Sequence, residues 1–396
     1  MPAQPGSPMQ RKPPSPRTRV IAADAPSPAG QVPIVTPTVQ STTFRIDGAL
    51  NDAMDRGDYR SQFLYTRMGN PTVRALEERL AELHHAEDAV CTASGMGALS
   101  ALLFAHTHPG DRVLVASALY GVTDSLLDRY LAPAGRTIER FDALQPDSLR
   151  HALDHGPAAL VLVETLTNPL VDAPDLPALA TLCQQHDTPL AVDYTFPNPL
   201  VCTPIPLGAT FVVESLSKSI AGHSDVHGGL VCGPRDAIHP VWEAMLHLGP
   251  CLDPHAATLV RRGLKTLALR TDAMQVGLGR IAEHLATHPD VARIHAPGHP
   301  HPLPSWLQGR GGMMSLVLRG GDPRALRFLD ALRIIEPATS LGGVESLACL
   351  PFNTSHRLPA SRERIGLQPG TVRLSVGCED PDDLLADLDH ALSASA

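Results

Sequence analysis

Short, continuous runs of apolar residues alternate with longer stretches of helical periodicity from about residue 71 onward. The runs are rich in valine and leucine and lie at residues 112–116, 159–163, 189–192, 211–213 and 229–232. Such runs are typical of strands buried on both faces of a parallel sheet. The periodic stretches predict helices over 71–83, 121–131, 148–154 and 176–186. This order predicts an α/β fold in which helices connect parallel strands by right-handed crossovers.

The pattern changes near Gly249, where we place a domain boundary. A helical region over 254–288 precedes turns at 297–304, a strand at 313–318 and helices at 323–332 and 380–392. The N-terminal thirty residues are polar and rich in proline, which predicts a flexible arm. The β-prone runs that follow predict an extended segment lying on another part of the protein. We therefore divide the chain into an arm (1–30), an extended segment (31–60), a large domain (61–249) and a small domain (250–396).

Composition excludes several classes of protein. The net charge of −9 and the lack of a dense basic run argue against nucleic acid as a partner. No apolar stretch has the length of a membrane span, and the first thirty residues contain no apolar signal core, so we expect a cytoplasmic protein with no membrane partner. The seven cysteines form no CxxC pair and predict reduced, packing side chains. The 19 histidines lie in no cluster with metal-ligand spacing, so we expect no metal site.

Lysine is scarce in this sequence, and one lysine stands out. Only Lys12, Lys218 and Lys265 occur, and Lys218 directly follows a predicted buried strand. Ligands of open α/β sheets bind beyond the carboxyl ends of the strands, although most lysines are simply solvated surface residues. A partly desolvated lysine attacks carbonyl groups, which points to a Schiff base with pyridoxal phosphate (PLP).

Three further features match what this cofactor requires. The turn around Gly95 and Met96 opens a helical stretch, where backbone N–H groups can bind a phosphate. Asp193 ends the preceding predicted strand and can hold a protonated ring nitrogen, although an aspartate there also caps turns. Tyr120 follows another strand and can stack on the cofactor ring, or it can pack in the core.

Taken together, these residues resemble the Cys/Met-metabolism family of PLP-dependent enzymes, of the cystathionine γ-synthase, cystathionine γ-lyase and methionine γ-lyase type. The segments that carry the resemblance are 65–72, 94–98, 120–121, 164–169, 192–196, 215–225, 263–267, 340–347 and 373–377. The resemblance implies a type I PLP-dependent fold, like that of aspartate aminotransferase, with a mainly parallel seven-stranded sheet and a smaller α/β C-terminal domain. It also implies a homotetramer built from two active-site dimers, with the segment 31–60 contacting the partner subunit.

The resemblance also implies roles for individual residues. Lys218 would form the Schiff base and move protons, Asp193 would hold the ring nitrogen, and Tyr120 would stack on the ring and pass a proton to the leaving group. The phosphate would be bound by Gly95, Met96, Ser215 and Ser217, and by Tyr65 and Arg67 of the neighbouring subunit. The carboxylate of a small amino-acid substrate would be bound by Asn168, Ser340 and Arg373.

The implied reaction is γ-replacement or γ-elimination on a homoserine ester or a cystathionine-like thioether, through a Lys218 aldimine and a β,γ-unsaturated ketimine. Thr339 stands where γ-synthases and cystathionine γ-lyases commonly carry Glu, which argues against cystathionine as the favoured substrate. Val122 stands where methionine γ-lyases commonly carry Cys. The alternatives are a β-lyase acting on cystathionine or cysteine, a methionine γ-lyase, and a catalytically silent homologue. Leu166 and Glu214 also depart from the family pattern.

Overall fold

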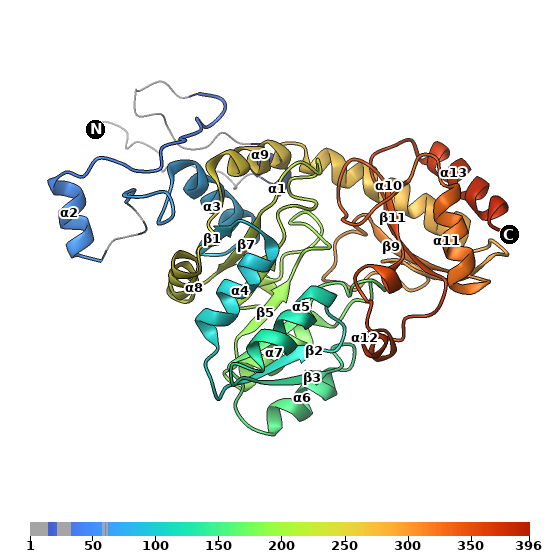
Figure 1. Ribbon diagram of the computed structural model, residues 1–396, viewed down its shortest axis with the longest axis horizontal. Helices are drawn as coiled ribbons and strands as arrows, with labels where there is room; N and C mark the ends of the chain where they lie inside the picture. Colours follow the sequence, from blue (N-terminus) through green and yellow to red (C-terminus); the bar gives the residue numbers. More distant parts are fainter. Residues whose placement is uncertain (1–14, 22–32, 58–59, 61) are drawn as a thin grey trace, which may run out of the picture.

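A computed structural model describes residues 15–21, 33–57, 60 and 62–396 (Figure 1). Its larger sheet has seven strands in the order β1-β7-β6-β5-β4-β2-β3. Their bounds are β1 Asp88–Thr92, β2 Arg112–Ala116, β3 Thr137–Phe141, β4 Leu160–Glu164, β5 Leu190–Asp193, β6 Phe211–Glu214 and β7 Gly229–Gly233. The five strands predicted from apolar runs are all present, within one residue at either end.

One of those strands runs in a direction that the prediction missed. β7 pairs antiparallel with both β1 and β6, whereas the remaining pairs of this sheet are parallel. No helix lies between β6 and β7, and a parallel connection within a sheet usually needs a crossover helix. The prediction of a parallel strand at 229–232 was therefore wrong, because an apolar run indicates burial and not direction.

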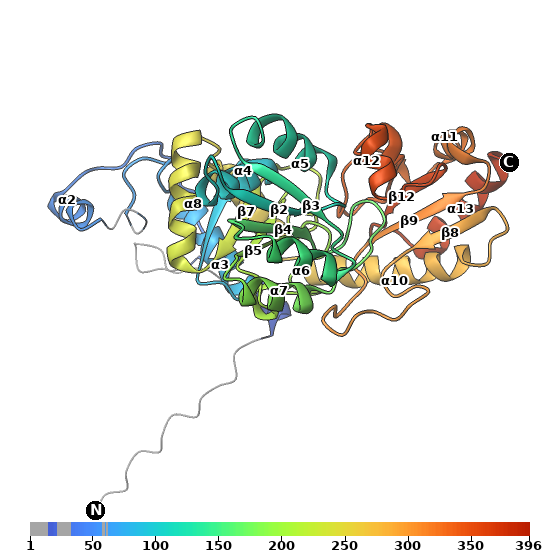
Figure 2. The same ribbon diagram turned by 90° about the horizontal axis from the view of Figure 1, so that it is seen from below.

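Helices cover this sheet and form two buried apolar clusters with it (Figure 2). One cluster includes side chains from α4, α6, α7 and α8, and the other includes side chains from α3 and α9. The bounds are α3 Pro71–His84, α4 Gly95–His106, α5 Gly121–Leu126, η1 Leu127–Leu131, α6 Pro146–Asp154, α7 Leu176–Gln185, η2 Ile205–Leu207, α8 Arg235–Leu248 and α9 Pro254–Leu264. The predicted helix at 121–131 is α5 continued by the π-helical turn η1.

A second sheet of five strands lies beside the first, with the C-terminal helices around it (Figure 1). Its strand order is β10-β11-β12-β9-β8. The bounds are β8 Val291–His295, β9 Met313–Leu318, β10 Glu336–Pro337, β11 Leu347–Cys349 and β12 Thr371–Ser375, with α10 Leu267–Leu285, α11 Gly321–Ala331, η3 Pro351–Asn353, α12 Pro359–Arg364 and α13 Pro381–Ala394. The predicted strand at 313–318 coincides with β9.

The helical region predicted over 254–288 is two helices, because α9 ends at Leu264 and α10 begins at Leu267. Side chains of α9, including Ala257 and Val260, lie in the same core as α3, whereas the later part of α10 lies in the core of the second sheet. A boundary at residue 249 remains a prediction, and the residues that follow it do not all belong to the second core.

The N-terminal region is more structured than the sequence indicated where the structure describes it. Residues 15–21 include the single-turn helix α1, Pro16–Arg19, and Val20 is buried. Arg17 pairs with Asp272, and Arg19 donates a hydrogen bond to the carbonyl of Glu82. The flexible arm is therefore not confirmed for these residues, and the rest of residues 1–30 lies outside the described residues.

The extended segment predicted over 31–60 contains a helix. Thr43 forms a bridge with Tyr65, as expected of extended chain, but α2 spans Gly48–Asp55. Asp47 caps α2 by accepting a hydrogen bond from the backbone of Leu50. The prediction was wrong here, since an N-cap aspartate ahead of a helical turn was overlooked.

In the described part of the chain, no helix is long and apolar enough to cross a membrane.

Candidate active site

Three acidic residues end three neighbouring strands at the carboxyl edge of the larger sheet. Glu164 ends β4, Asp193 ends β5 and Glu214 ends β6, and Glu164 pairs in register with Asp193. Glu164 and Glu214 are buried and Asp193 is half-buried, and burial raises the pKa of each carboxyl group. Lys218 lies four positions beyond the end of β6, in a turn, so the amine and the acids share one edge of the sheet.

Asp193 is held by the residue two positions after it. Its Oδ1 accepts hydrogen bonds from Thr195 N at 3.1 Å and from Thr195 Oγ1 at 2.7 Å. Thr195 Oγ1 in turn accepts a hydrogen bond from Ser215 N at 3.1 Å. The two bonds from Thr195 lower the pKa of Asp193 and oppose the larger effect of burial. Both bonds fall on Oδ1, so Oδ2 would be left to accept a hydrogen bond from a protonated ring nitrogen.

Lys218 belongs to a chain of hydrogen bonds that joins the two sheets. Its Nζ donates to Ser340 Oγ at 2.8 Å, and the carbonyl of Ser340 accepts from Arg373 Nη2 at 3.0 Å. Arg373 Nη1 donates to Asn168 Oδ1 at 3.2 Å. Burial lowers the pKa of Lys218, and the charge of Arg373 lowers it further. The structure therefore brings together Lys218 and the three predicted substrate-binding residues.

The Gly95 turn lies beside the Ser215 turn. Ser94 caps α4 by accepting a hydrogen bond from Gly97 N, and a Cβ on Gly95 would lie 2.9 Å from Ser215 Cβ. Ser217 Oγ accepts a hydrogen bond from Gly228 N at 3.0 Å. Met96 is half-buried and packs against the larger core. The glycine at position 95 thus permits the close approach of two segments that sequence analysis assigned to the phosphate.

Tyr120 immediately precedes α5 and lies at the same edge of the sheet. Its backbone N donates a hydrogen bond to Glu164 Oε1 at 2.6 Å, and its side chain is 37% exposed. Burial raises the pKa of Tyr120, while the charge of Arg373 lowers it and that of Asp193 raises it. Tyr120 is therefore close to Arg373 and Asp193, as expected of a ring that covers a cofactor.

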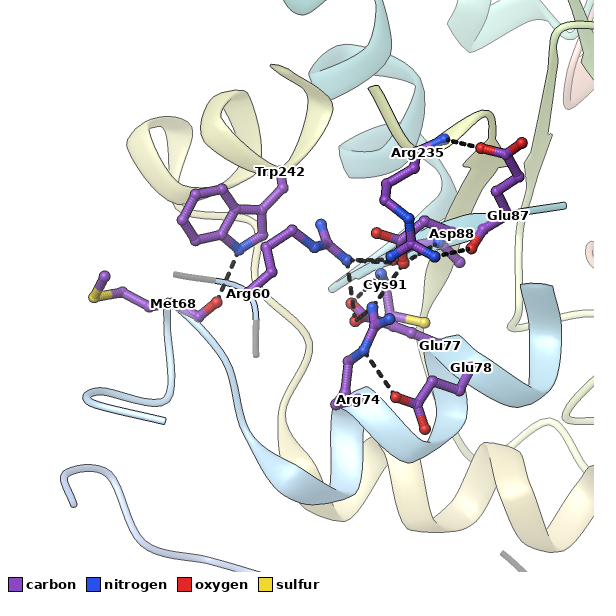
Figure 3. Close-up of polar contacts among 11 residues, drawn as sticks. Arg60, Met68, Arg74, Glu77, Glu78, Glu87, Asp88, Cys91, Arg235 and Trp242 are labelled. Atoms are coloured by element: carbon purple, nitrogen blue, oxygen red, sulfur yellow. Dashed lines mark hydrogen bonds and ion pairs between the residues drawn. The ribbon is translucent and has the colours of Figure 1, made fainter. Parts of the chain in front are cut away.

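Tyr65 and Arg67 lie apart from this group. The Arg67 guanidinium is 5.3 Å from the centre of the Tyr65 ring, and Tyr65 is 41% exposed. The neighbouring residue Met68 accepts a hydrogen bond from Trp242 Nε1, beside a cluster of ion pairs among Arg60, Arg74, Glu77 and Asp88 (Figure 3). Within the described residues, the contacts of Tyr65 and Arg67 do not reach Lys218 of the same chain.

Two residues of the site, Thr195 and Glu164, were not predicted from the sequence, and the presence of Glu214 had no explanation. Asp193 was identified because it is a polar residue at the carboxyl end of a buried strand. Glu164 has the same position at the end of β4, and Thr195 lies two positions beyond the end of β5. Glu214 Oε2 lies 3.1 Å from Nε2 of the buried His84 of α3, so a second titratable side chain accompanies the unusual acid at this position.

These residues fit the cofactor that the sequence suggested. The amine of Lys218 has a lowered pKa, Asp193 is a half-buried carboxylate at the same edge of the sheet, and the Gly95 and Ser215 turns, which could bind a phosphate, lie against each other. No group of three potential metal-ligating side chains occurs in the part of the chain described. The fold and the site define a PLP-dependent enzyme of the type I fold class.

Comparisons with known proteins give the family. The family model "Cys/Met metabolism PLP-dependent enzyme" matches residues 17–393, and the chain belongs to this family. The L-methionine γ-lyase of Pseudomonas putida is 36% identical over 374 residues, which cover 92% of this chain and 93% of that protein. The O-succinylhomoserine sulfhydrylase of Pseudomonas aeruginosa is 38% identical over 338 residues, with 84% of each protein covered.

A solved structure agrees with this assignment. The cystathionine γ-synthase of Xanthomonas oryzae pv. oryzae, in complex with aminoacrylate and cysteine, matches with a TM-score of 0.90 and 36% identity. The match covers 97% of this chain and 99% of that one. The expected fold class and cofactor are thereby confirmed.

Proposed function

We propose that this enzyme catalyses γ-replacement or γ-elimination on a γ-substituted amino acid. The observation that carries the proposal is the hydrogen-bonded chain from Lys218 through Ser340 and Arg373 to Asn168. It places a proton-transferring amine next to a guanidinium, whose planar fork suits the carboxylate of an amino acid. The names of the relatives support γ-chemistry, since they include γ-lyases, a γ-synthase and a homoserine-ester sulfhydrylase.

The residues have the following roles in the proposal. PLP, when bound to Lys218, supplies an electron sink for the negative charge that develops at Cα of the substrate. Lys218 would remove the Cα proton of the substrate, and Ser340 Oγ would orient the Lys218 amine for this transfer. Asp193 keeps the proton on the ring nitrogen, and Tyr120 covers the ring and delivers a proton to the leaving group.

In the proposal, two separate groups of residues hold the phosphate and the substrate carboxylate. The phosphate is bound by Gly95, Met96, Ser215 and Ser217. Arg373 and Asn168 bind the substrate carboxylate. Because a Cβ on Gly95 would lie 2.9 Å from Ser215 Cβ, a larger residue at position 95 would push the two phosphate-binding turns apart.

We propose a homoserine ester as the substrate. Thr339 adjoins Ser340 and is exposed, so the residue before the carboxylate-binding loop is uncharged and offers no partner for a distal ammonium group. An ester of homoserine carries no such ammonium, whereas cystathionine does. A methionine γ-lyase and a cystathionine β-lyase remain the competing activities.

The purified enzyme tests this choice through its products. Wild type and Lys218→Ala would be compared by visible absorbance, then incubated with O-acetylhomoserine, O-succinylhomoserine, cystathionine and methionine, with and without a thiol. We expect a visible band only in wild type, and 2-oxobutanoate or a thioether from an ester. Pyruvate from cystathionine would identify a β-lyase, and turnover of methionine alone would identify a methionine γ-lyase. No product from any γ-substituted amino acid would refute the proposal.

We also propose a homotetramer of two active-site dimers, in which Tyr65 and Arg67 bind the phosphate in the neighbouring subunit. Among the described residues, the contacts of Tyr65 and Arg67 do not include Lys218 of the same chain, and this observation and the exposure of Tyr65 support the arrangement. Mixing the inactive variants Lys218→Ala and Arg67→Ala tests it. Shared sites would restore about a quarter of the wild-type activity, because half of the randomly formed dimers then hold one intact site. No recovery after proven subunit exchange would show that each chain builds its site alone.

A further inference from the structure

Glu164 is a buried carboxylate with an unusual set of partners. It is 6% exposed, and it forms no ion pair with any described residue. Instead, Oε1 accepts a hydrogen bond from Tyr120 N at 2.6 Å, and Oε2 accepts one from Asn168 N at 2.8 Å. Burying a carboxyl group whose hydrogen bonds from the described residues come only from backbone N–H groups costs desolvation free energy. We therefore expect Glu164 to have a structural or functional role at this position.

The two donors belong to segments with different tasks. Tyr120 immediately precedes α5 and carries the ring assigned to stacking on the cofactor. Asn168 accepts a hydrogen bond from Arg373. Arg373 also donates to the carbonyl of Ser340, whose hydroxyl accepts from Lys218. One carboxylate therefore connects the stacking ring with the group that binds the substrate carboxylate. A rotation of this carboxylate would shift both segments together.

The neighbour of Glu164 in the sheet is Asp193, and the two residues are paired in register on adjacent parallel strands. Burial raises the pKa of Glu164 and the charge of Asp193 raises it further, whereas the two backbone hydrogen bonds lower it. A cation bound at Asp193 would therefore stabilise the ionised form of both acids. Glu164 thus lies next to all three parts of the site: the stacking ring, the ring-nitrogen partner and the substrate clamp.

We propose that Glu164 is a positioning residue that holds Tyr120 and Asn168 at a fixed separation, so that the cofactor ring and the substrate carboxylate are bound in one geometry. This proposal rests on the assignment of the cofactor site to Lys218 and Asp193. In this proposal, the Glu164 carboxylate touches neither substrate nor cofactor. It acts through the two backbone N–H groups from which it accepts hydrogen bonds.

The test is Glu164→Gln, which preserves the shape of the side chain but replaces one acceptor oxygen by a donor. Asp387→Asn is the matched control, because Asp387 is 4% exposed and accepts hydrogen bonds from the backbone of Arg333, Ile334 and Ile335, within the smaller unit. Both substitutions remove a buried carboxylate from backbone donors. Only Glu164→Gln should disturb the active site.

Three measurements distinguish positioning from stability alone. They are the visible circular dichroism of bound PLP, the dissociation constant of PLP by equilibrium dialysis, and spectral titration with L-norvaline, which has no leaving group. We expect Glu164→Gln to change the circular dichroism and to weaken binding of both PLP and L-norvaline by about tenfold or more, the usual range for a lost hydrogen bond to a charged group. Glu164→Asp should recover part of this loss, and Asp387→Asn should lower only the melting temperature.

The proposal is overturned if Glu164→Gln melts like Asp387→Asn and binds PLP and L-norvaline with unchanged circular dichroism. Should Glu164→Gln fail to fold, the comparison of Glu164→Asp with wild type decides by the same measurements. A visible band that persists in Lys218→Ala would instead refute the assignment of the site itself, which separates the two failures.

Discussion

The amine of Lys218 donates a hydrogen bond to the hydroxyl of Ser340, 2.8 Å away, although 122 positions separate them in the sequence. Lys218 follows a strand of the larger sheet, and Ser340 follows β10 of the smaller sheet. Ser340 has a φ of 87°, a left-handed conformation that is uncommon for residues other than glycine. In this conformation, the Ser340 carbonyl accepts from Arg373 while its hydroxyl accepts from Lys218. The site is therefore closed only when the two sheets are packed together.

Replacing Lys218 by Arg should abolish the visible absorbance of the bound cofactor. Arginine keeps the positive charge, but its guanidinium does not supply the neutral amine that forms a Schiff base. Lys265→Arg is the control, because Lys265 caps α9 outside the site and should keep the wild-type spectrum. An unchanged band in Lys218→Arg would place the Schiff base at another amine.

Replacing Arg373 by Gln should raise KM for the amino-acid substrate more than it lowers kcat. The substitution removes the guanidinium proposed to bind the substrate carboxylate, and we expect KM to rise by about tenfold to a hundredfold, as for the loss of a charged hydrogen bond. Initial rates over a range of substrate concentrations check this expectation. An unchanged KM would move the carboxylate site away from Arg373.

The same substitution should shift the pH dependence of cofactor binding. Burial, followed by the charge of Arg373, lowers the pKa of Lys218 below its ordinary value of 10.5. The amine of the cofactor-free enzyme therefore becomes neutral and reactive at a lower pH than that of an exposed lysine. Arg373→Gln removes the repulsive charge, so the midpoint of the rate of PLP incorporation against pH should move to higher pH. A shift to lower pH would contradict the electrostatic effect of Arg373.

Gly121→Ala should lower kcat/KM by displacing the Tyr120 segment. A Cβ at position 121 would lie 1.8 Å from the carbonyl oxygen of Ser355, so either the Tyr120 segment or the loop after η3 has to move. We expect a loss of about tenfold or more, since a small displacement of a positioned group is costly for catalysis.

Gly279→Ala provides the control for this prediction. Gly279 lies within α10, and a Cβ there would meet only the end of the Arg310 side chain at 3.8 Å. This change should leave kcat/KM unaltered and stabilise the protein by about 0.5–1 kcal/mol, since alanine favours helix. Equal activity of the two variants would show that the contact between Gly121 and Ser355 has no influence on Tyr120.

The protein should lose stability between pH 6.5 and pH 4 because of His356. This side chain is 1% exposed, and burial lowers its pKa from the ordinary 6.5 to about 4. In this pH range, the unfolded chain binds a proton that the folded chain does not, so stability decreases as the pH falls. The contribution reaches about 3 kcal/mol near pH 4, because each unit of pKa shift corresponds to about 1.4 kcal/mol.

Urea unfolding of wild type and His356→Gln at pH 7, 5.5 and 4 checks this prediction. The slope of the unfolding free energy against pH should become shallower in the variant. His301→Gln is a substitution control at an exposed position. The prediction would be wrong if His356→Gln and His301→Gln followed the same slope as wild type.

The sequence predicted the elements of the fold well where burial alone defines them. In the five apolar runs that are strands, all residues except the half-buried Arg112, Ala159 and Pro189 are buried, and β9 matched in full. The edge strand β3 went unpredicted, because it pairs only with β2 and has a mixed pattern of exposure instead of an apolar run. The antiparallel direction of β7 went unpredicted as well, since a buried strand has the same composition in either direction.

The site residues also divide into those that the sequence singled out and those whose role is visible only in the tertiary structure. Lys218, Asp193 and Tyr120 could be singled out because each follows a strand and carries a side chain that is rare or chemically distinctive in this sequence. Glu164 gives the same signal, but its importance lies in accepting from the backbone of Tyr120 and Asn168, and backbone donors leave no trace in the sequence. Thr195 escaped notice because a threonine after a strand is common in many contexts.

By itself, the sequence determined the alternation of five strands with helices in the larger domain, the family and the amine on which the chemistry depends, because periodicity, residue type and motif spacing are local properties. Only the tertiary structure decided the direction of β7, the contact of Lys218 with Ser340 and the two backbone donors of Glu164. These features join residues that lie from 4 to 122 positions apart, across sheets and turns. Their geometry follows from how the two cores pack against each other, and no local pattern encodes that packing.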